Sequence, residues 1–221
     1  MQRLLDILFS GLALLVLSPL LLPVMLILRL TGEGEVFFIQ QRIGRGGQPF
    51  GLYKFATMLK NSPNIGTGTV TVKGDPRVLP FGRFLRKTKI NELPQLLNIF
   101  KGDMSVIGPR PQTRRCFDAF PASSQAEIIK VRPGLSGIGS IVFRDEEELM
   151  HASKEPERFY DEVIMPYKGK LEEWYVARQG LWTYLAAIFA TAWVVVFPKS
   201  ELVWRLFPGL PSPPATLANK V

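Results

Sequence analysis

A long apolar segment near the N-terminus constrains the fold of this chain more than any other feature. From Leu4 to Leu28 the only charged residue is Asp6. A stretch of about 20 or more apolar residues is long enough to span a bilayer as a helix. We therefore expect a membrane anchor over residues 1–30, followed by a folded domain.

Three interpretations of this segment compete. A secretory signal peptide would end in a small-residue cleavage site, and no such site precedes Arg29. Ser18-Pro19 and Pro23 predict a break, because proline removes a backbone donor and Ser18 can bond the carbonyl that is freed. Arg3 and Arg29 flank the two ends, and positive charge stays on the cytoplasmic side. A re-entrant hairpin within one leaflet and a kinked spanning helix both remain open.

Two stretches rich in strand-forming residues follow the anchor. Residues 36–42 (VFFIQQR) and 50–55 (FGLYKF) are separated by a glycine-containing turn, which predicts a β-hairpin. Further on, apolar residues recur at helical spacing from Glu92 to Gly102, with Asn91 placed to cap the helix. A cap followed by a first-turn acid would explain Asn91 and Glu92 without any function.

The C-terminal half contains one more apolar run, at residues 181–197. It is short for a membrane-spanning helix, and its tryptophan and tyrosine side chains are typical of the membrane interface. An interfacial helix and a buried core helix both fit this pattern. The proline-rich residues 198–221 predict a flexible tail. The chain is thus predicted to form a compact, membrane-associated α/β (α+β) domain over residues 31–197, with interfacial amphipathic helices.

The charge of the chain is concentrated in its middle. The net charge is +8, and residues 40–115 hold 14 Lys or Arg against three acids. An anionic ligand is expected there. Residues 145–173 reverse the balance with ten acids, which argues against a nucleic-acid-binding surface.

The cysteine and histidine content limits the metal chemistry. One cysteine, Cys116, and one histidine, His151, exclude an internal disulfide and any site built from several Cys or His ligands. Carboxylate and phosphate oxygens are the ligands that Mg²⁺ prefers, so Mg²⁺ is the expected metal.

A basic segment, residues 81–111, carries the residues best suited to catalysis. Arg86 belongs to a group of cations that precedes Glu92. In the G-P-R-P loop at 108–111 each proline restricts the backbone, so Arg110 loses little entropy when it grips a phosphate with two hydrogen bonds. Glu92 at a helix N-terminus stays ionised and can bind Mg²⁺, accept a proton or attack phosphorus. Together with a membrane anchor, these residues predict phosphoryl transfer at a lipid surface.

The ordered motifs resemble those of the monotopic phosphoglycosyl transferases, a family of bacterial sugar transferases, over nearly the whole chain to residue 197. Several motifs in one order are harder to obtain by chance than any single one. They are the Ser18-Pro19 pair in the apolar segment, VFFIQQRIGRGGQPFGLYKFATM at 36–58, GRFLRKTKINELPQLLNIFKGDMSVIGPRP at 82–111 and RPGLSG at 132–137.

The resemblance implies an α/β domain on the cytoplasmic face of a bacterial inner membrane, anchored by a re-entrant helix that is broken at Ser18-Pro19. It implies Mg²⁺-dependent transfer of a sugar phosphate from a UDP-sugar to polyprenyl (undecaprenyl) phosphate. The products would be polyprenyl-diphosphate-sugar and UMP, formed through a covalent phospho-enzyme at the start of surface glycan assembly. The implied partners are these substrates and membrane lipid, without nucleic acid, and a homodimer is compatible with them.

The family pattern gives roles to individual residues. Glu92 and the residue before it stand at the catalytic positions, and Glu92 with Asp103 would hold the metal. Asp103 fits equally well as an acid that caps the following turn. The residues expected to bind substrate phosphate are Lys54, Arg86, Pro109, Arg110 and Pro111.

Two residues depart from the family pattern. The family carries an Asp-Glu pair whose aspartate is the nucleophile, and this chain has Asn91-Glu92. An amide cannot do that, so either Glu92 is the nucleophile, or Asn91 orients the phosphate for direct displacement, or the chain is inactive, or the asparagine is introduced or deamidated. Ala56 stands where the family usually has arginine, so one phosphate or headgroup contact is absent. The alternative function is a catalytically impaired homologue that binds nucleotide-sugar, lipid or a partner enzyme.

Overall fold

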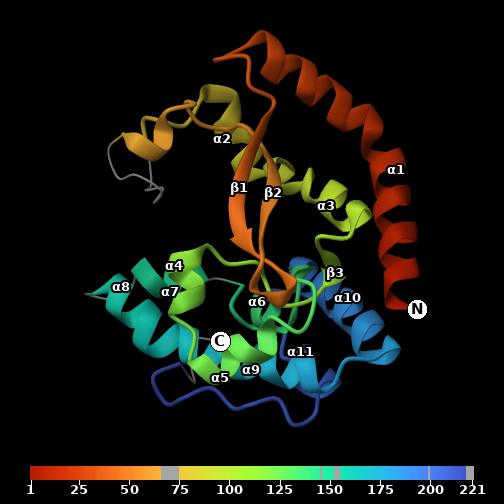
Figure 1. Ribbon diagram of the computed structural model, residues 1–221, viewed down its shortest axis with the longest axis vertical. Coiled ribbons are helices and arrows are strands. Elements are labelled where there is room, and N and C mark those ends of the chain that lie inside the picture. Colours follow the sequence, from red (N-terminus) through yellow and green to blue (C-terminus); the bar gives the residue numbers. More distant parts are fainter. Residues whose placement is uncertain (66–74, 145, 152–154, 199, 218–221) are drawn as a thin grey trace. The chain divides into compact units, whose positions relative to one another are not determined.

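The computed structural model describes residues 1–65, 75–144, 146–151, 155–198 and 200–217. The chain divides into two compact units and contains both helices and strands (Figure 1). The domain boundaries predicted at residues 30 and 197 stay a prediction. The larger unit comprises Met1–Asp6, Arg42–Phe50 and Gly102–Val221, and the smaller unit comprises Ile7–Gln41 and Gly51–Lys101.

The N-terminal apolar segment forms one helix, α1 (Gln2–Leu30), which contains Pro19 and Pro23. Pro19 has no N–H to donate to the carbonyl of Leu15, and Ser18 Oγ donates to that carbonyl instead, at 2.7 Å. This confirms the predicted role of Ser18. The ribbon of α1 bends (Figure 1). The sequence predicted a break at Ser18-Pro19, but the helix continues through these two residues. In the described part of the chain, α1 is the one helix long and apolar enough to cross a membrane.

One face of α1 forms the core of the smaller unit. Leu21, Val24 and Leu28 are buried with Phe55 and Leu85. Burial of each such side chain contributes about 1.5–3 kcal/mol. The remaining surface of the helix in this unit exposes a large apolar area, which is typical of a lipid or partner contact. Its exposed side chains include Leu8, Leu12, Leu15, Leu22 and Leu26.

The predicted hairpin is confirmed. Strands β1 (Phe37–Ile43) and β2 (Pro49–Phe55) form a two-stranded sheet. They are joined by the short 3₁₀ turn η1 (Arg45–Gly47), in which Gly46 and Gly47 have φ of 71° and 73°. Positive φ favours glycine, so the glycine turn is a structural feature. The rest of the smaller unit contains η2 (Ser62–Asn64), α2 (Pro80–Lys87), η3 (Ile90–Glu92) and α3 (Gln95–Lys101).

The helix predicted to begin at Glu92 begins three residues later. Asn91 and Glu92 lie in the 3₁₀ turn η3, and the first residue of α3 is Gln95. The N–H groups of Leu93, Leu96 and Leu97 donate to the carbonyls three residues earlier, so this stretch has 3₁₀ geometry up to the start of α3. Asn91 therefore does not cap α3. The predicted end of the helix at Gly102 is confirmed. Gly102 follows Lys101, the last residue of α3, and its φ is 104°.

The larger unit is built around a short parallel sheet and the helix α9. In the sheet, Ser105 of β3 lies opposite Gly134 of β4, and Ile107 lies opposite Ser136. Helix α9 is largely buried, which makes it the core element of the unit. The elements are β3 (Ser105–Ile107), α4 (Arg114–Asp118), α5 (Ala122–Ile128), β4 (Gly134–Ser136), α6 (Ile138–Val142), α7 (Glu146–His151), α8 (Pro156–Phe159), the π-helix η4 (Tyr160–Ile164), α9 (Met165–Ala177), α10 (Leu181–Val196) and α11 (Leu202–Leu206).

The second apolar run forms α10, which has one buried and one exposed face. Tyr184, Ala187 and Ala190 are buried within the larger unit, whereas Trp182 and Phe189 are exposed. The buried face fits the interpretation as a core helix, and the position of the exposed face at a membrane interface stays a prediction.

The residues after α10 are packed rather than extended as a free tail. The ring of Phe207 meets Trp174 edge-on, with centroids 5.8 Å apart. Tyr167 donates to the carbonyl of Pro211 at 2.8 Å, and Leu217 is fully buried. Within residues 200–217 the expected flexible tail does not match this packing, because apolar side chains placed between the prolines are buried. Residue 199 and residues 218–221, which the prediction also covers, lie outside the described residues.

Candidate active site

In the smaller unit, Asn91 carries the most unusual polar group. The residue is buried, and its Oδ1 has no hydrogen-bond partner within the described ranges. Leaving a buried acceptor unpaired costs about 1–3 kcal/mol, so such a group calls for an explanation. Glu92, next to it, is half-buried. The pair thus presents one free amide oxygen beside one carboxylate.

The turn that holds Asn91 and Glu92 is entered through a strained residue. Lys89 has a φ of 59°, and no other non-glycine residue in the described part of the chain has a positive φ. This left-handed conformation costs about 1–2 kcal/mol for a residue with a Cβ. The carbonyl of Lys89 accepts the N–H of Glu92 at 3.1 Å, which closes the turn. Strain of this kind is concentrated at functional sites.

Close packing places the predicted cations on neighbouring elements of the smaller unit. A Cβ added to Gly82 in α2 would lie 2.2 Å from the carbonyl oxygen of Thr57, so only glycine fits. The N–H of Leu79 donates to the same carbonyl at 3.0 Å. These contacts hold α2, which carries Arg86, against the end of β2, which carries Lys54.

The residues after β2 explain one departure from the family pattern. Ala56 is buried, and its N–H donates to the carbonyl of Val36 at 3.0 Å. A buried methyl group offers no anion contact here, in agreement with the prediction. Arg86 is half-buried, and its Nη1 lies 3.8 Å from Sδ of Met58.

In the larger unit, two motifs that are distant in sequence pack backbone to backbone. The N–H of Gly108 donates to Ser136 at 2.9 Å, and the N–H of Gly134 donates to Pro109 at 2.8 Å. A Cβ on Gly134 would lie 2.1 Å from the nitrogen of Gly108, and one on Gly137 would lie 2.1 Å from its oxygen. The G-P-R-P loop is therefore held by the R-P-G-L-S-G segment.

Arg110 lies at the tip of this loop. Pro109 and Pro111 on either side are buried, whereas Arg110 is half-buried. The carbonyl of Pro111 accepts a hydrogen bond from Nη1 of Arg42 at 3.1 Å. The side chain of Arg110 thus projects from a backbone that is fixed on both sides.

The sequence did not single out Glu172, which lies beneath this loop on α9. A Cβ on Gly139 would lie 2.3 Å from its Oε1, so the carboxyl group abuts the backbone. Burial raises the pKa of Glu172 to about 7, although Lys168 and the N–H groups of Arg110 and Gly139 lower it. None of the described groups offers either carboxyl oxygen a hydrogen bond of good geometry. Lys168 and Glu172 are four residues apart, a spacing usually found in exposed helical pairs, so sequence reasoning had no signal for this burial.

The acid within the apolar segment is also explained. Asp6 is buried, and its Oδ1 accepts hydrogen bonds from Ser105 Oγ at 2.9 Å, from Val106 N at 2.9 Å and from Tyr184 Oη at 2.8 Å. A charge in an apolar helix is expected to be paired in this way. The isolated acid in an apolar run was the signal in the sequence.

The predicted metal ligands are not brought together within either unit. Glu92 belongs to the smaller unit, and Asp103 is exposed in the larger one. Within the described ranges, no group of three or more His, Cys, Asp or Glu side chains could hold a metal. Mg²⁺, however, usually takes one or two protein carboxylates together with substrate phosphates. The carboxylate of Glu92 and the unpaired Oδ1 of Asn91 fit that requirement.

Residues 1–198 match the family described as bacterial sugar transferase. A UDP-N-acetylgalactosamine-undecaprenyl-phosphate N-acetylgalactosaminephosphotransferase of Aeromonas hydrophila is 41% identical over 143 residues, which cover 64% of this chain and 34% of the relative. The exopolysaccharide production protein ExoY of Rhizobium meliloti is 36% identical, over 66% of this chain and 70% of its own length. An undecaprenyl-phosphate galactose phosphotransferase of Salmonella typhimurium is 31% identical, over 89% of this chain and 40% of its own length.

The aligned part of this chain spans only about a third of the Aeromonas relative. The family match, in contrast, includes every candidate residue described above, from Ser18 to Glu172. On this evidence the chain belongs to the bacterial sugar transferase family.

Proposed function

We propose that this chain transfers a sugar phosphate from a UDP-sugar to polyprenyl phosphate, giving polyprenyl-diphosphate-sugar and UMP. The observation that carries the proposal is the family match over residues 1–198. Relatives named as undecaprenyl-phosphate sugar phosphotransferases support the substrate classes. The product would begin the assembly of a surface glycan.

The protein acts at the cytoplasmic face of the bacterial inner membrane, with α1 as a re-entrant anchor. The exposed apolar surface of α1, the bend-tolerating hydrogen bond of Ser18 and the arginines at both ends support this topology. Cysteines placed at residues 2 and 31 provide the test. Both are labelled by a membrane-impermeant reagent from the cytoplasm if α1 is re-entrant, and only one if it spans.

The chemistry displaces UMP from the phosphorus next to the sugar. Arg110 and Lys54 bind phosphate oxygens and neutralise their charge. Glu92 would hold Mg²⁺, with Asn91 Oδ1 as a further oxygen ligand, and the bound ion would neutralise charge on the diphosphate. An oxygen of polyprenyl phosphate forms the new P–O bond, and the bond to UMP breaks.

Two routes fit these residues. They give the same products and differ in whether UMP is released before the acceptor reacts. If Glu92 attacks phosphorus, a sugar-phosphoryl enzyme forms and one equivalent of UMP is released without acceptor. In direct displacement, UMP appears only when polyprenyl phosphate is present. The unpaired Oδ1 of Asn91 favours direct displacement, because an amide oxygen could hold Mg²⁺ beside the phosphate but cannot attack phosphorus. Rapid mixing with and without acceptor separates the routes.

The test of the function is UMP release by the purified chain with Mg²⁺, polyprenyl phosphate and a panel of UDP-sugars. Activity that is lost in Glu92→Gln supports the proposal and shows that Asn91 is compatible with turnover. Activity that appears only in Asn91→Asp would mean that the scaffold is intact but lacks its nucleophile.

The second candidate is a binding protein that has lost catalysis. The asparagine at the nucleophile position favours it. Binding of UDP-sugar by a chain that releases no UMP, even as Asn91→Asp, would establish this candidate in place of the enzyme.

A further inference from the structure

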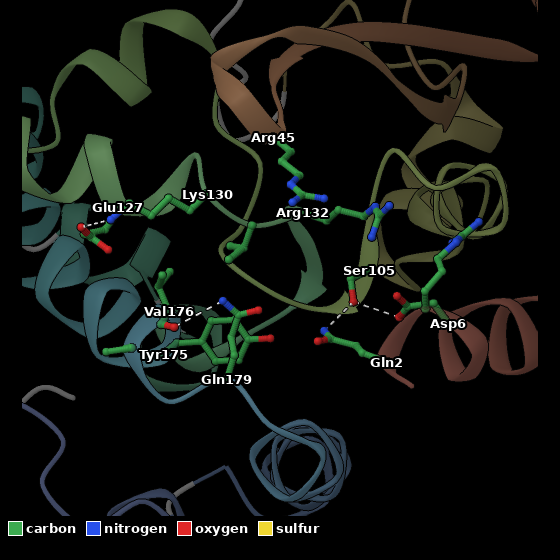
Figure 2. A pocket seen from close by; sticks show the side chains of 13 residues that line it. Gln2, Asp6, Arg45, Ser105, Glu127, Lys130, Arg132, Tyr175, Val176 and Gln179 are labelled. Carbon is green, nitrogen blue, oxygen red and sulfur yellow. Dashed lines mark hydrogen bonds and ion pairs between the residues drawn. The ribbon is translucent and has the colours of Figure 1, made fainter.

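The larger unit contains a polar cavity that none of the candidate catalytic residues lines. Its volume is about 430 Å³, within the range of about 300–1,000 Å³ that is typical of small-ligand sites. It lies between the N-terminus of α1, the η1 turn, the segment before β4 and the C-terminal end of α9 (Figure 2).

The cavity has more positive than negative charge. Four cations line it, and its two acids are already engaged. Asp6 accepts three hydrogen bonds through Oδ1 from neighbouring groups, as described above. Glu127 pairs with Lys130 at one side of the cavity (Figure 2). Four cations and two carboxylates leave a net charge of +2. Besides Lys130, the cations are the arginines Arg3, Arg45 and Arg132.

Two of these arginines are positioned by the backbone of Gly102. Nε of Arg132 donates to the carbonyl of Gly102 at 2.8 Å, which fixes the guanidinium plane. The guanidinium of Arg3 occupies the space beside Gly102, where a Cβ would lie 3.1 Å from Nη2. One glycine thus holds two like charges at one wall of the cavity.

The third arginine reaches the cavity from the hairpin turn. Arg45 is exposed, and the N–H of the following Gly46 donates to Ile129 at 2.7 Å, which anchors the turn. Figure 2 shows Arg45 and Arg132 extending toward the same space. Neither forms an ion pair with any acid in the described ranges. Two guanidinium groups that form no ion pair, as these two, are suited to binding a phosphate.

The surroundings indicate where that phosphate comes from. Leu4 follows the cavity residues Gln2 and Arg3 and is 68% exposed. Trp182 follows the cavity residue Gln179 closely and is 73% exposed. Apolar surface with an interfacial tryptophan therefore begins at the edge of the cavity, as expected where a protein meets lipid headgroups.

We propose that this cavity binds the phosphodiester headgroup of an anionic phospholipid through Arg45 and Arg132. The acyl chains would lie along the exposed apolar side chains of α10 and the first turn of α1. This lipid is neither substrate nor product of the proposed reaction. Its binding holds the larger unit at the membrane surface.

The test measures equilibrium binding of short-chain phosphatidylglycerol to the full chain in neutral detergent micelles. Phosphatidylcholine of the same chain length and inorganic phosphate are separate titrants. One phosphatidylglycerol per chain is expected, bound more tightly than either of the others. Because a charge-assisted pair is lost, Arg45→Gln should weaken that binding by about tenfold.

Lys170→Gln is the matched control. Lys170 is an exposed residue of the same unit outside the cavity, and its replacement removes the same unit of charge. Binding that is equally weak in Lys170→Gln and Arg45→Gln would reduce the effect to general charge and overturn the proposal. Equal binding of phosphatidylcholine, or a full effect of inorganic phosphate alone, would overturn the lipid assignment. Thermal melting of both variants checks that they fold, and Arg45→Lys, which keeps the charge but loses the bidentate fork, should give an intermediate affinity.

Discussion

The two regions that carry the candidate catalytic residues are built in opposite ways. In the larger unit, Arg110 projects from a loop whose backbone is bonded to a second motif and packed without space for a Cβ. In the smaller unit, Asn91 and Glu92 lie on a single turn that is entered through the strained Lys89. The first region is fixed by backbone hydrogen bonds between two motifs, whereas the second is a single turn of strained backbone.

This difference assigns separate tasks to the two regions. A close-packed loop resists change, so substitutions there should reduce the free energy of unfolding. A strained turn with an unmet acceptor is less stable than it could be, so substitutions there should affect turnover more than stability. Four sets of substitutions test this difference between the two regions.

The largest effect is expected for Gly134→Ala. Its Cβ would lie 2.1 Å from a backbone nitrogen, and backbone cannot move aside as a flexible side chain can. We expect the free energy of unfolding in detergent micelles to fall by at least about 3 kcal/mol, as for a severely overpacked site.

Gly180→Ala is the control for this substitution. Gly180 has an extended φ of −178°, and a Cβ there meets nothing within 4 Å. Its stability should change by less than about 1 kcal/mol. Equal stability of the two variants would contradict the close packing of the two motifs.

The next effect is a dependence on pH caused by Glu172. Its pKa is raised from 4.5 to about 7, so the folded chain holds a proton that the unfolded chain releases in this window. Stability is therefore full below about pH 4.5 and falls as the pH rises toward 7. At about 1.36 kcal/mol per pKa unit, the loss is about 3 kcal/mol.

Glu172→Gln should remove this loss, so the variant gains stability relative to the natural chain above about pH 7. Urea unfolding at several pH values measures the effect. Glu157→Gln, at an exposed position of the same unit, should leave the slope unchanged. A Glu172→Gln profile parallel to that of the natural chain would show that Glu172 is not the titrating group.

The sequence predicted features that depend on local contacts. The β1–β2 hairpin followed from strand-forming runs around a glycine turn, and the role of Ser18 followed from the proline next to it. The motifs with Arg110 and Glu92 were also found, because their residue types are distinctive over a short span.

Features that depend on distant contacts were missed. The pairing of β3 with β4 joins segments of three residues each, too short for a strand pattern and far apart in the chain. The burial of Glu172 depends on packing against Gly139, which no local pattern encodes. Asn91 was assigned to a helix cap because the cap pattern does not distinguish the first turn of an α-helix from the 3₁₀ turn that is found here.

A third prediction compares two buried asparagines of the smaller unit. Asn98 is fully buried, accepts from Tyr53 N at 2.9 Å and donates to Gly51 O at 2.8 Å. Asn98→Ala should cost about 2 kcal/mol, because it leaves both strand groups unpaired. Asn91→Ala should cost less than about 1 kcal/mol, because its Oδ1 has no partner to lose.

The two substitutions should affect UMP release in the opposite order, with a larger loss of rate in Asn91→Ala than in Asn98→Ala for each kcal/mol of stability that is lost. Asn91→Ala should lower the rate of UMP release by about 100-fold or more, as for loss of a group that positions the reacting phosphate. If Asn91→Ala proved as destabilising as Asn98→Ala with unaltered UMP release, Asn91 would be structural.

The smallest effect is expected at Lys89, where the strain of the turn can be released. Lys89→Gly removes the Cβ that makes a φ of 59° costly, so the free energy of unfolding should rise by about 1 kcal/mol despite the greater freedom of the unfolded chain. Lys87→Gly is the matched control, because Lys87 has a helical backbone in α2, where glycine costs about 0.5–1 kcal/mol. If urea unfolding shows a higher free energy of unfolding for Lys89→Gly and a lower one for Lys87→Gly, the turn stores strain. A loss of UMP release in the more stable Lys89→Gly chain would then show that the strained backbone positions Asn91 and Glu92, whereas unchanged UMP release would separate the strain from the chemistry.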